Sequence, residues 1–417
     1  MSDCCEEFGQ LSRRGLLRGA AGALGVGVTT SVFGATFMQT SYAATQSAGN
    51  VLVLLSLRGA ADGLSLVVPH GDPAYYAARP KIAIPSDRLL AKDGFFGLHP
   101  SMTALVPLWN AGKVAAVHAT GLPVANRSHF SAMEELEDAD PGSAARVGWL
   151  NRLIGQDDYT HPLQGIGMGM SVPITALYGP QATVTTTSVD DLSLAGDDAD
   201  DTLHRRRSSM HTMWSSAPGT LGRGVRSALS AVSDFGPVRS TSETAAHGAT
   251  YSDDDLGRAL HAAARTIKGD VGVEVIAVDH EDGWDMHTGL GTLAWGQMIR
   301  NADALATSIA AFFTDLGTLG SKVTLVTISE FGRRVKENAN YGLDHGHGNV
   351  MFLVGAGVKG GYYGTWPGLV NSLDADLNVT TDYRSVLSEV VVKRLGASSA
   401  AVFPSFTPET VGAVLTA

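Results

Sequence analysis

The sequence has 417 residues, of which 44% are hydrophobic, and a formal net charge of −11. This composition is typical of a globular protein with a buried core and excludes a largely disordered chain. Non-specific binding to nucleic acid requires clustered Lys and Arg, so the acidic balance predicts no nucleic-acid partner.

The N-terminal region has the three parts of a secretory signal. The adjacent Arg13 and Arg14 precede an apolar, Gly/Ala-rich stretch from about residue 19 to residue 38, and small residues for a signal peptidase follow at Ser41 and Ala43. Paired arginines indicate the twin-arginine (Tat) form of such a signal. We therefore predict a Tat signal peptide at 1–43, the Tat translocase as a partner during export, and a secreted, periplasmic or cell-envelope location.

A membrane anchor is the alternative interpretation of this stretch. It is rich in glycine, only moderately hydrophobic and ends at the predicted cleavage site, so we expect no stable membrane span after cleavage. Cys4 and Cys5 are the only cysteines, and both precede the arginines. The mature chain can therefore form no disulfide and use no cysteine as zinc ligand or nucleophile.

The remaining sequence alternates between short apolar runs and stretches with helical spacing. We expect buried strands at 50–56, 114–118, 273–278, 322–328 and 350–354, and helices at 100–112, 292–316 and 383–395. This alternation predicts an α/β fold, a three-layer α/β/α sandwich with a mostly parallel central sheet. The segment 183–253 is rich in Ser, Thr, Asp and Gly, which predicts an irregular insertion, a lid or a partly mobile segment.

Ligands of open α/β sheets bind where the strands end, and chemically active residues follow several of the predicted strands. The candidates are Asp62 after the first strand, Arg127, Ser128 and His129 after the second, Asp279, His280, Asp285 and His287 after the third, Glu330 after the fourth, and His345 and His347 just before the fifth. Carboxylates and imidazoles together suit Zn²⁺ or Mn²⁺, or Ca²⁺ or Mg²⁺ with fewer histidines.

Each candidate also has a structural interpretation. Asp62 is a possible helix cap or turn residue, and Ser128 a possible helix N-cap. Glu330 is a possible surface ion-pair partner of Arg333 or Arg334. The histidines and Asp285 are possible ordinary loop residues. These alternatives weaken when the residues are taken together, because all of them fall at the same edge of the predicted sheet.

Several phrases of the sequence resemble a bacterial exported family known as domain of unknown function 1501. They are Leu57-Arg-Gly-Ala-Ala-Asp-Gly-Leu64, Gly97-Leu-His-Pro100, Arg127-Ser-His-Phe130, Gly148-Trp-Leu150, Ser329-Glu-Phe-Gly-Arg333 and Asp344-His-Gly-His-Gly-Asn349. The family looks like a distant branch of the alkaline phosphatase and sulfatase superfamily. The resemblance implies one such domain over 50–417, with one or two divalent metal ions, Zn, Mn or Ca, beside a nucleophile.

Carried over residue by residue, the superfamily pattern makes Ser128 the nucleophile. It assigns the metal to Asp62, Asp285, His287, Glu330 and either His345 or His347. Arg127 would clamp an anionic ester substrate, and His99 and His129 would position groups or transfer protons.

The resulting hypothesis is an exported metal-dependent hydrolase of phosphate or sulfate-type esters. The short Asp285-Met-His287 spacing and Phe331 after Glu330 depart from the superfamily pattern. These departures favour the alternative, a non-catalytic secreted binding or envelope-assembly protein that retains the fold. A third possibility is an exported transferase acting on envelope glycans or lipids.

Overall fold

The computed structural model describes residues 35–37, 47–141, 143, 146–156, 161–197, 201–281 and 283–416. The predicted signal peptide at 1–43 therefore lies outside the described residues, except for the short strand β1 (Ala35–Phe37). No helix in the described ranges is long and apolar enough to cross a membrane.

The centre of the molecule is a ten-stranded, mostly parallel sheet, as predicted. Its strand order is β1-β7-β6-β8-β2-β9-β10-β5-β11, with β12 also pairing with β5. The bounds are β2 Val51–Leu57, β5 Val114–Gly121, β6 Gly165–Met168, β7 Val184–Thr186, β8 Val275–His280, β9 Val323–Ile328, β10 Asn349–Gly355, β11 Gly361–Tyr363 and β12 Thr381–Asp382. A separate two-stranded sheet is formed by β3 Val67–Val68 and β4 Gly97–Leu98.

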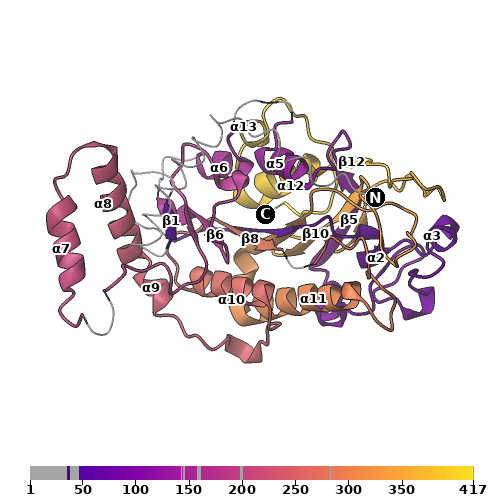
Figure 1. The fold of residues 1–417 in the computed structure, drawn as a ribbon, viewed down its shortest axis with the longest axis horizontal. Helices are drawn as coiled ribbons and strands as arrows, with labels where there is room; N and C mark the ends of the chain where they lie inside the picture. Colours follow the sequence, from indigo (N-terminus) through magenta and orange to yellow (C-terminus); the bar gives the residue numbers. More distant parts are fainter. Residues whose placement is uncertain are drawn as a thin grey trace.

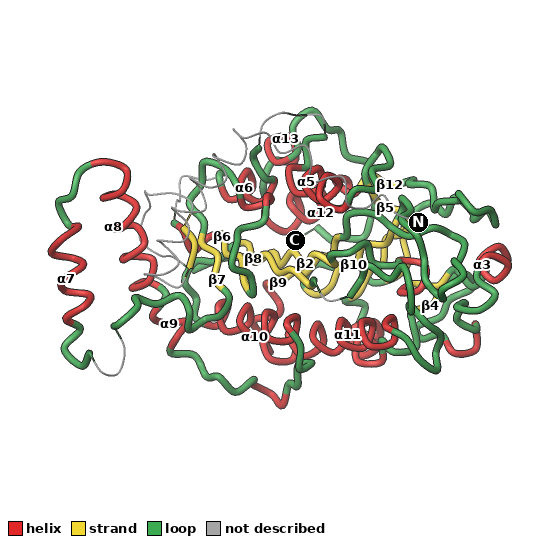
Figure 2. The backbone as a smooth tube through the Cα atoms, in the orientation of Figure 1, coloured by secondary structure: helices red, strands yellow, loops and turns green. Residues whose placement is uncertain are grey.

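Helices cover both faces of the large sheet, which gives the three predicted layers (Figures 1 and 2). On one face lie α5 His129–Asp138, α6 Trp149–Ile154, α12 Tyr383–Leu395 and α13 Ser399–Val402, and on the other lie α10 Asp255–Lys268 and α11 Gln297–Leu316. The fully buried strand β2 shows why two covering layers are needed. Val53 and Leu55 belong to the core on one side of the sheet, and Leu52 and Leu54 to the core on the other.

Shorter helices complete the chain. They are α2 Gly63–Leu66, α3 Pro73–Ala78, α4 Val106–Asn110 and the 3₁₀ turns Ser86–Arg88, Thr103–Leu105, Pro162–Gln164, Thr175–Leu177, Ala246–Gly248 and Gly317–Lys322. The helix expected at 100–112 is thus reduced to one 3₁₀ turn and one short α-helix. Pro107 lies in the first turn of α4, where its missing N–H leaves no intrahelical bond unmade.

The segment 183–253 contains more regular structure than its composition predicts. Besides β7 it forms α7 Arg205–Trp214, α8 Gly219–Asp234 and α9 Gly236–Arg239. The α7–α8 hairpin projects from one end of the sheet (Figure 1). The apolar side of α8, with Ala228, Leu229 and Val232, is buried.

Strand direction brings the functional loops to one edge of the sheet. β2 runs parallel to β8 and β9, so the loops after all three leave at the same edge. β10 runs antiparallel to both β9 and β5. The loop before β10 and the loop after β5 therefore reach this same edge, as the sequence analysis predicted.

Candidate metal centre

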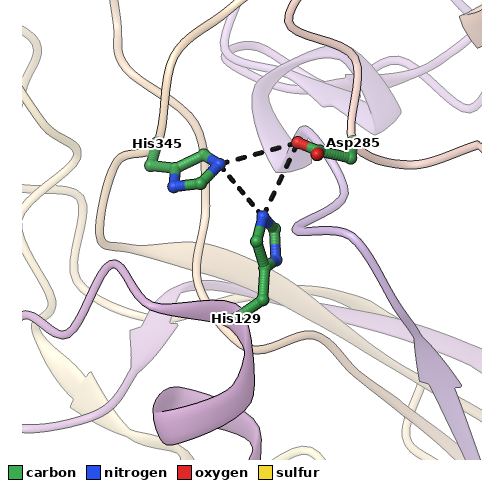
Figure 3. Close-up of side chains that lie close together, drawn as sticks. All are labelled: His129, Asp285 and His345. Carbon is green, nitrogen blue, oxygen red and sulfur yellow. Dashed lines mark hydrogen bonds and ion pairs between the residues drawn. The ribbon is translucent and has the colours of Figure 1, made fainter. Parts of the chain in front are cut away.

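Three side chains from three separate loops converge at this edge. His129 is the first residue of α5, Asp285 follows β8, and His345 precedes β10. One ligand atom from each of them lies within 4.8 Å of the other two (Figure 3). His287 extends the group, because its Nε2 lies 2.8 Å from His345 Nε2 and 3.2 Å from Asp285 Oδ1.

The hydrogen bonds around the three histidines determine which ring nitrogen carries the proton. Nδ1 of His129 lies 2.7 Å from Glu330 Oε1, Nδ1 of His345 lies 2.9 Å from the main-chain oxygen of Arg127, and Nδ1 of His287 lies 3.3 Å from Asp344 Oδ1. Each partner is an oxygen acceptor, so each Nδ1 is the donor. In a neutral imidazole the opposite nitrogen, Nε2, is then an acceptor.

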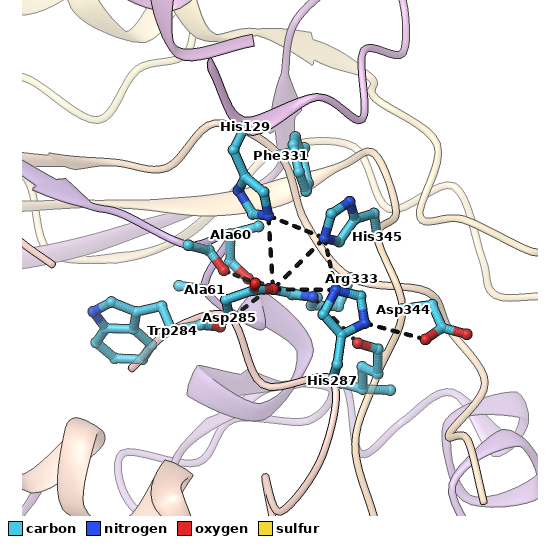
Figure 4. Close-up of polar contacts among 12 residues, drawn as sticks. Ala60, Ala61, His129, Trp284, Asp285, His287, Phe331, Arg333, Asp344 and His345 are labelled. Atoms are coloured by element: carbon cyan, nitrogen blue, oxygen red, sulfur yellow. Dashed lines mark hydrogen bonds and ion pairs between the residues drawn. The ribbon is translucent and has the colours of Figure 1, made fainter. Parts of the chain in front are cut away.

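These acceptors face one another. His345 Nε2 is 3.0 Å from His129 Nε2 and 2.8 Å from His287 Nε2, and all three approach the Asp285 carboxylate (Figure 4). Lone pairs on three nitrogens and a carboxylate oxygen repel one another unless a positive charge lies between them. Because oxygen acceptors that fix the outward nitrogen are the usual surroundings of metal-binding histidines, the residues fit a metal ion.

The pKa values of His129 and Asp285 also show that positive charge is favoured in the cluster. Burial alone lowers the pKa of His129, but its contacts with Asp285 and Glu330 raise it to about 9. The pKa of Asp285 is held well below its usual range by His129, His345 and Arg333, which outweigh its partial burial. A metal ion that binds this cluster therefore has to displace a proton from His129.

A buried arginine holds Asp285 in place. Arg333 Nη2 donates to Asp285 Oδ1 at 2.6 Å, while Nε donates to the main-chain oxygen of Ala60 at 2.7 Å. The same guanidinium also donates to the main-chain oxygens of Gly59, Trp284 and Leu343. From the sequence, Arg333 was expected only as a possible surface partner of Glu330. Instead Glu330 is buried and pairs with His129, and Arg333 orients the carboxylate of the cluster.

Three predicted metal ligands lie outside the cluster: Glu330, which bonds Nδ1 of His129, and Asp62 and His347. Asp62 is completely buried and forms a two-pronged ion pair with Arg79, with Nη1 2.5 Å from Oδ2 and Nη2 3.0 Å from Oδ1. His347 lies two residues after His345, but its Nε2 is 2.9 Å from the main-chain oxygen of Leu122. Of the two histidines in this loop, His345 therefore lies in the cluster, whereas His347 bonds the backbone.

Two of the predicted catalytic residues have other partners. His99 is buried, accepts a hydrogen bond at Nδ1 from the amide of Ser101, and has its pKa lowered by burial to about 4. The exposed guanidinium of Arg127 pairs with Asp376.

Ser128 occupies the N-cap position of α5, directly before His129, and its side chain makes no capping hydrogen bond. This position matches the helix-cap interpretation, although the bond that usually accompanies it is absent. Ser128 is therefore the neighbour in sequence of His129, one of the cluster residues.

A cavity of about 630 Å³ opens beside the cluster and is lined by His129, Asp285 and Glu330 among others. Its deeper wall contains Arg58, which bonds Asp279 and Glu137 at 2.6 Å each. Burial, only partly offset by Arg58, raises the pKa of Glu137 to about 7. Arg58 and Glu137 were not among the predicted site residues. The sequence feature that could have indicated Arg58 is its position directly after the first buried strand.

The family model for the protein of unknown function DUF1501 matches residues 50–388. The chain belongs to this family. The motifs quoted above thus predicted the family correctly.

Solved structures that match the chain include members of the expected superfamily. The zinc complex of the periplasmic domain of EcEptC from Escherichia coli is 11% identical over 76% of each chain, with a TM-score of 0.33. The alkaline phosphatase of the Antarctic bacterium TAB5 is 13% identical over 75% of this chain and 93% of its own, with a TM-score of 0.30.

The sulfatase PsFucS1 from Pseudoalteromonas sp. is 11% identical over 87% of this chain and 73% of its own, with a TM-score of 0.31. At these scores the similarities assign no activity, substrate or metal to this chain. No curated protein matches it.

We predict that Zn²⁺ stabilises the folded protein through this cluster. At 100 times its dissociation constant, a ligand of the folded state alone adds about 2.7 kcal/mol to the free energy of unfolding. His345→Ala is expected to abolish this gain, whereas His347→Ala, the matched control in the same loop, is expected to keep it. Denaturant unfolding with and without Zn²⁺ measures the effect. Equal gains in both variants would contradict the assignment of His345.

We predict that Asp62 acts through stability and not through metal binding. Asp62→Ala leaves the buried guanidinium of Arg79 without its counter-charge, a change that costs about 3–5 kcal/mol in comparable buried pairs. The decrease in the free energy of unfolding should be the same with and without Zn²⁺. A variant of normal stability that no longer responds to Zn²⁺ would instead make Asp62 a ligand.

We predict a pH-dependent contribution to stability from Glu137. Its pKa of about 7 in the folded protein is above the unfolded value of 4.5, so the folded state binds this proton more tightly. The contribution is therefore complete below pH 4.5 and is lost as the pH rises through 7, with a slope of at most about 1.4 kcal/mol per pH unit. In denaturant titrations between pH 4.5 and 8, Glu137→Gln should remove this fall relative to wild type. An identical pH profile would show that Glu137 titrates normally.

Proposed function

We propose that the protein is a metal-dependent hydrolase of phosphate or sulfate-type esters that works after export through the Tat pathway. The observation that carries this proposal is the convergence of three imidazole Nε2 atoms and the Asp285 carboxylate beside an open cavity. The Tat route rests on Arg13 and Arg14 and the apolar stretch after them.

His129, Asp285 and His345 would hold the ion, with His287 as a fourth ligand. Imidazole nitrogen is a preferred donor for Zn²⁺ and is uncommon around Ca²⁺, so we favour Zn²⁺, with Mn²⁺ second. When bound, the ion would polarise the ester oxygens and lower the pKa of an attacking hydroxyl.

The protein contributes orientation and charge around that ion. Glu330, Asp344 and the main-chain oxygen of Arg127 keep the three imidazoles in the ligating tautomer, and Arg333 holds Asp285. The N-terminal end of the ten-residue helix α5 begins at His129, and its partial positive charge favours a bound anion. We assign Ser128, at this helix end, as the nucleophile.

One observation favours the alternative of a binding protein without catalysis. The guanidinium groups near the cluster are already paired with carboxylates: Arg58 with Glu137 and Asp279, Arg127 with Asp376, and Arg333 with Asp285. Recognition of an anionic ester would then depend on the metal ion and the helix end. A protein that binds metal and ester but turns nothing over would match this alternative.

The decisive experiment measures hydrolysis of 4-nitrophenyl phosphate, bis(4-nitrophenyl) phosphate and 4-nitrophenyl sulfate after chelation and reloading with Zn²⁺, Mn²⁺ or Ca²⁺. We expect turnover with Zn²⁺ or Mn²⁺ and a loss of at least about 100-fold in Ser128→Ala, the range of removing a catalytic group. His347→Ala is the control with wild-type rates. Full activity of Ser128→Ala would remove the nucleophile assignment, and turnover unaffected by chelation would remove the metal from the reaction.

The supporting role of Glu330 gives a further prediction. Glu330→Gln keeps the shape but weakens the acceptor that fixes His129, and such changes typically lower metal affinity about 10- to 100-fold. Competition with a chromogenic chelator measures the dissociation constant. An unchanged constant would show that His129 does not contribute to metal binding.

A further inference from the structure

His345 is held by two different loops, one of which supports its side chain and the other its main chain. Its Nδ1 donates to the main-chain oxygen of Arg127 at 2.9 Å, in the loop after β5. Its main chain pairs with Arg333, in the segment after β9. Beside this bridge the amide of Arg334 donates to the oxygen of Asp344 at 2.9 Å. The imidazole therefore keeps its direction only while the two loops keep their positions relative to each other.

The loop after β5 has little packing of its own to hold Arg127 in place. Residues 123–125 and Arg127 are exposed. The side chain of Asn126 bonds Ser131 and Glu135, which belong to the adjoining helix α5, so these contacts are local. An exposed loop with few buried apolar contacts is among the least stable parts of a fold. Bonds to another part of the chain are therefore needed to fix the Arg127 oxygen.

Asp376 makes this connection. Its Oδ2 accepts a hydrogen bond from Arg127 Nη2, and its Oδ1 accepts one from Arg334 Nη1 at 3.0 Å. Arg334 also donates to the main-chain oxygen of Asp374. Arg127 belongs to the loop that accepts the hydrogen bond from His345, and Arg334 belongs to the segment that pairs with the His345 main chain. One carboxylate thus joins the two supports of the same imidazole.

The surroundings of Asp376 favour strong ion pairs. Its side chain is 13% exposed and that of Arg334 is 19% exposed, although that of Arg127 is 39% exposed. Partly buried charges are screened less by salt than exposed ones, and a carboxylate shared by two guanidinium groups forms a network, which contributes more than an isolated surface pair. Asp376 therefore holds the loop after β5 by charge where apolar packing is lacking.

We propose that Asp376 is a positioning residue for His345. By holding Arg127 and Arg334 together, it keeps the main-chain oxygen of Arg127 against Nδ1 of His345, so that Nε2 remains unprotonated and directed toward the metal ion. This inference rests on the proposed metal site and adds to it a residue that acts without being a ligand. It also changes the role expected of Arg127, whose guanidinium anchors the loop and whose backbone oxygen acts on the cluster.

The first test determines the tautomer of His345 by NMR of the metal-free protein, with ¹⁵N-labelled histidine and His345→Ala to assign the signals. Wild type should carry the proton on Nδ1. Asp376→Asn removes the charge and keeps the shape, so its His345 signals should move toward a mixture of both tautomers. Asp374→Asn is the matched control and should match wild type, because this exposed side chain of the same loop has no ion pair among the described residues.

The second test measures the Zn²⁺ dissociation constant by competition with a chromogenic chelator. Asp376→Asn should raise it about tenfold, the lower end of the effect of losing an outer-shell partner, and Asp374→Asn should leave it unchanged. Arg127→Ala keeps the backbone oxygen but removes the guanidinium, so it should raise the constant as well. Because Asp376 acts through Arg127, the double variant should bind Zn²⁺ no more weakly than Asp376→Asn alone.

A wild-type tautomer in Asp376→Asn would overturn the inference whatever the stability of that variant, because a loss of stability alone does not move the proton between the ring nitrogens. Equal losses of Zn²⁺ affinity in Asp376→Asn and Asp374→Asn would also overturn it, since they would show a general disturbance of the loop. Additive effects of Arg127→Ala and Asp376→Asn would contradict the action through Arg127.

The proposed function and this inference fail separately. If wild type binds no metal ion and leaves 4-nitrophenyl phosphate intact while Asp376→Asn still loses the Nδ1 tautomer, the hydrolase proposal fails and the positioning of His345 stands. If wild type hydrolyses the ester with Zn²⁺ and Asp376→Asn keeps both the tautomer and the rate, only the positioning role fails.

Discussion

One buried guanidinium connects the loops on which the candidate site depends. Arg333 follows β9 and bonds main-chain oxygens of Gly59 and Ala60 after β2, Trp284 after β8, and Leu343 before β10. Only its remaining bond goes to a side chain, that of Asp285. The positions of the cluster's loops are therefore set by a residue that need not touch the metal or the substrate.

Much of the fold and part of the site follow from the sequence. The buried strands are continuous apolar runs, and parallel strands place whatever follows them at one edge, which is why Asp285, His287 and His345 were predicted together. His129 was also expected at this edge, but in a catalytic role. Its proposed role as a ligand depends on Glu330, which accepts a hydrogen bond from its Nδ1. These two residues are 201 positions apart, so no local pattern shows the contact.

The predicted residues that lie apart from the cluster do so for equally specific reasons. Asp62 follows its strand as Asp285 follows β8, but Arg79, 17 residues later, bonds both of its carboxylate oxygens. His345 and His347 are alike in sequence, and only the fold decides that one faces the cluster and the other the backbone oxygen of Leu122. The helices of 183–253 were not predicted because the segment was judged by its overall Ser, Thr, Asp and Gly content, although α8 has buried apolar residues at helical spacing, Ala228, Leu229 and Val232.

The separation of the cluster's residues along the chain has a consequence for how an ion would enter the protein. His129 and His345 are 216 positions apart, and His287 and His345 are 58 apart. An unfolded chain would have to close several long loops at once to bring them together, so an ion would be captured only after the chain has folded. If such an ion dissociated more slowly than the folded protein was exported, its identity would report the compartment in which the protein folded.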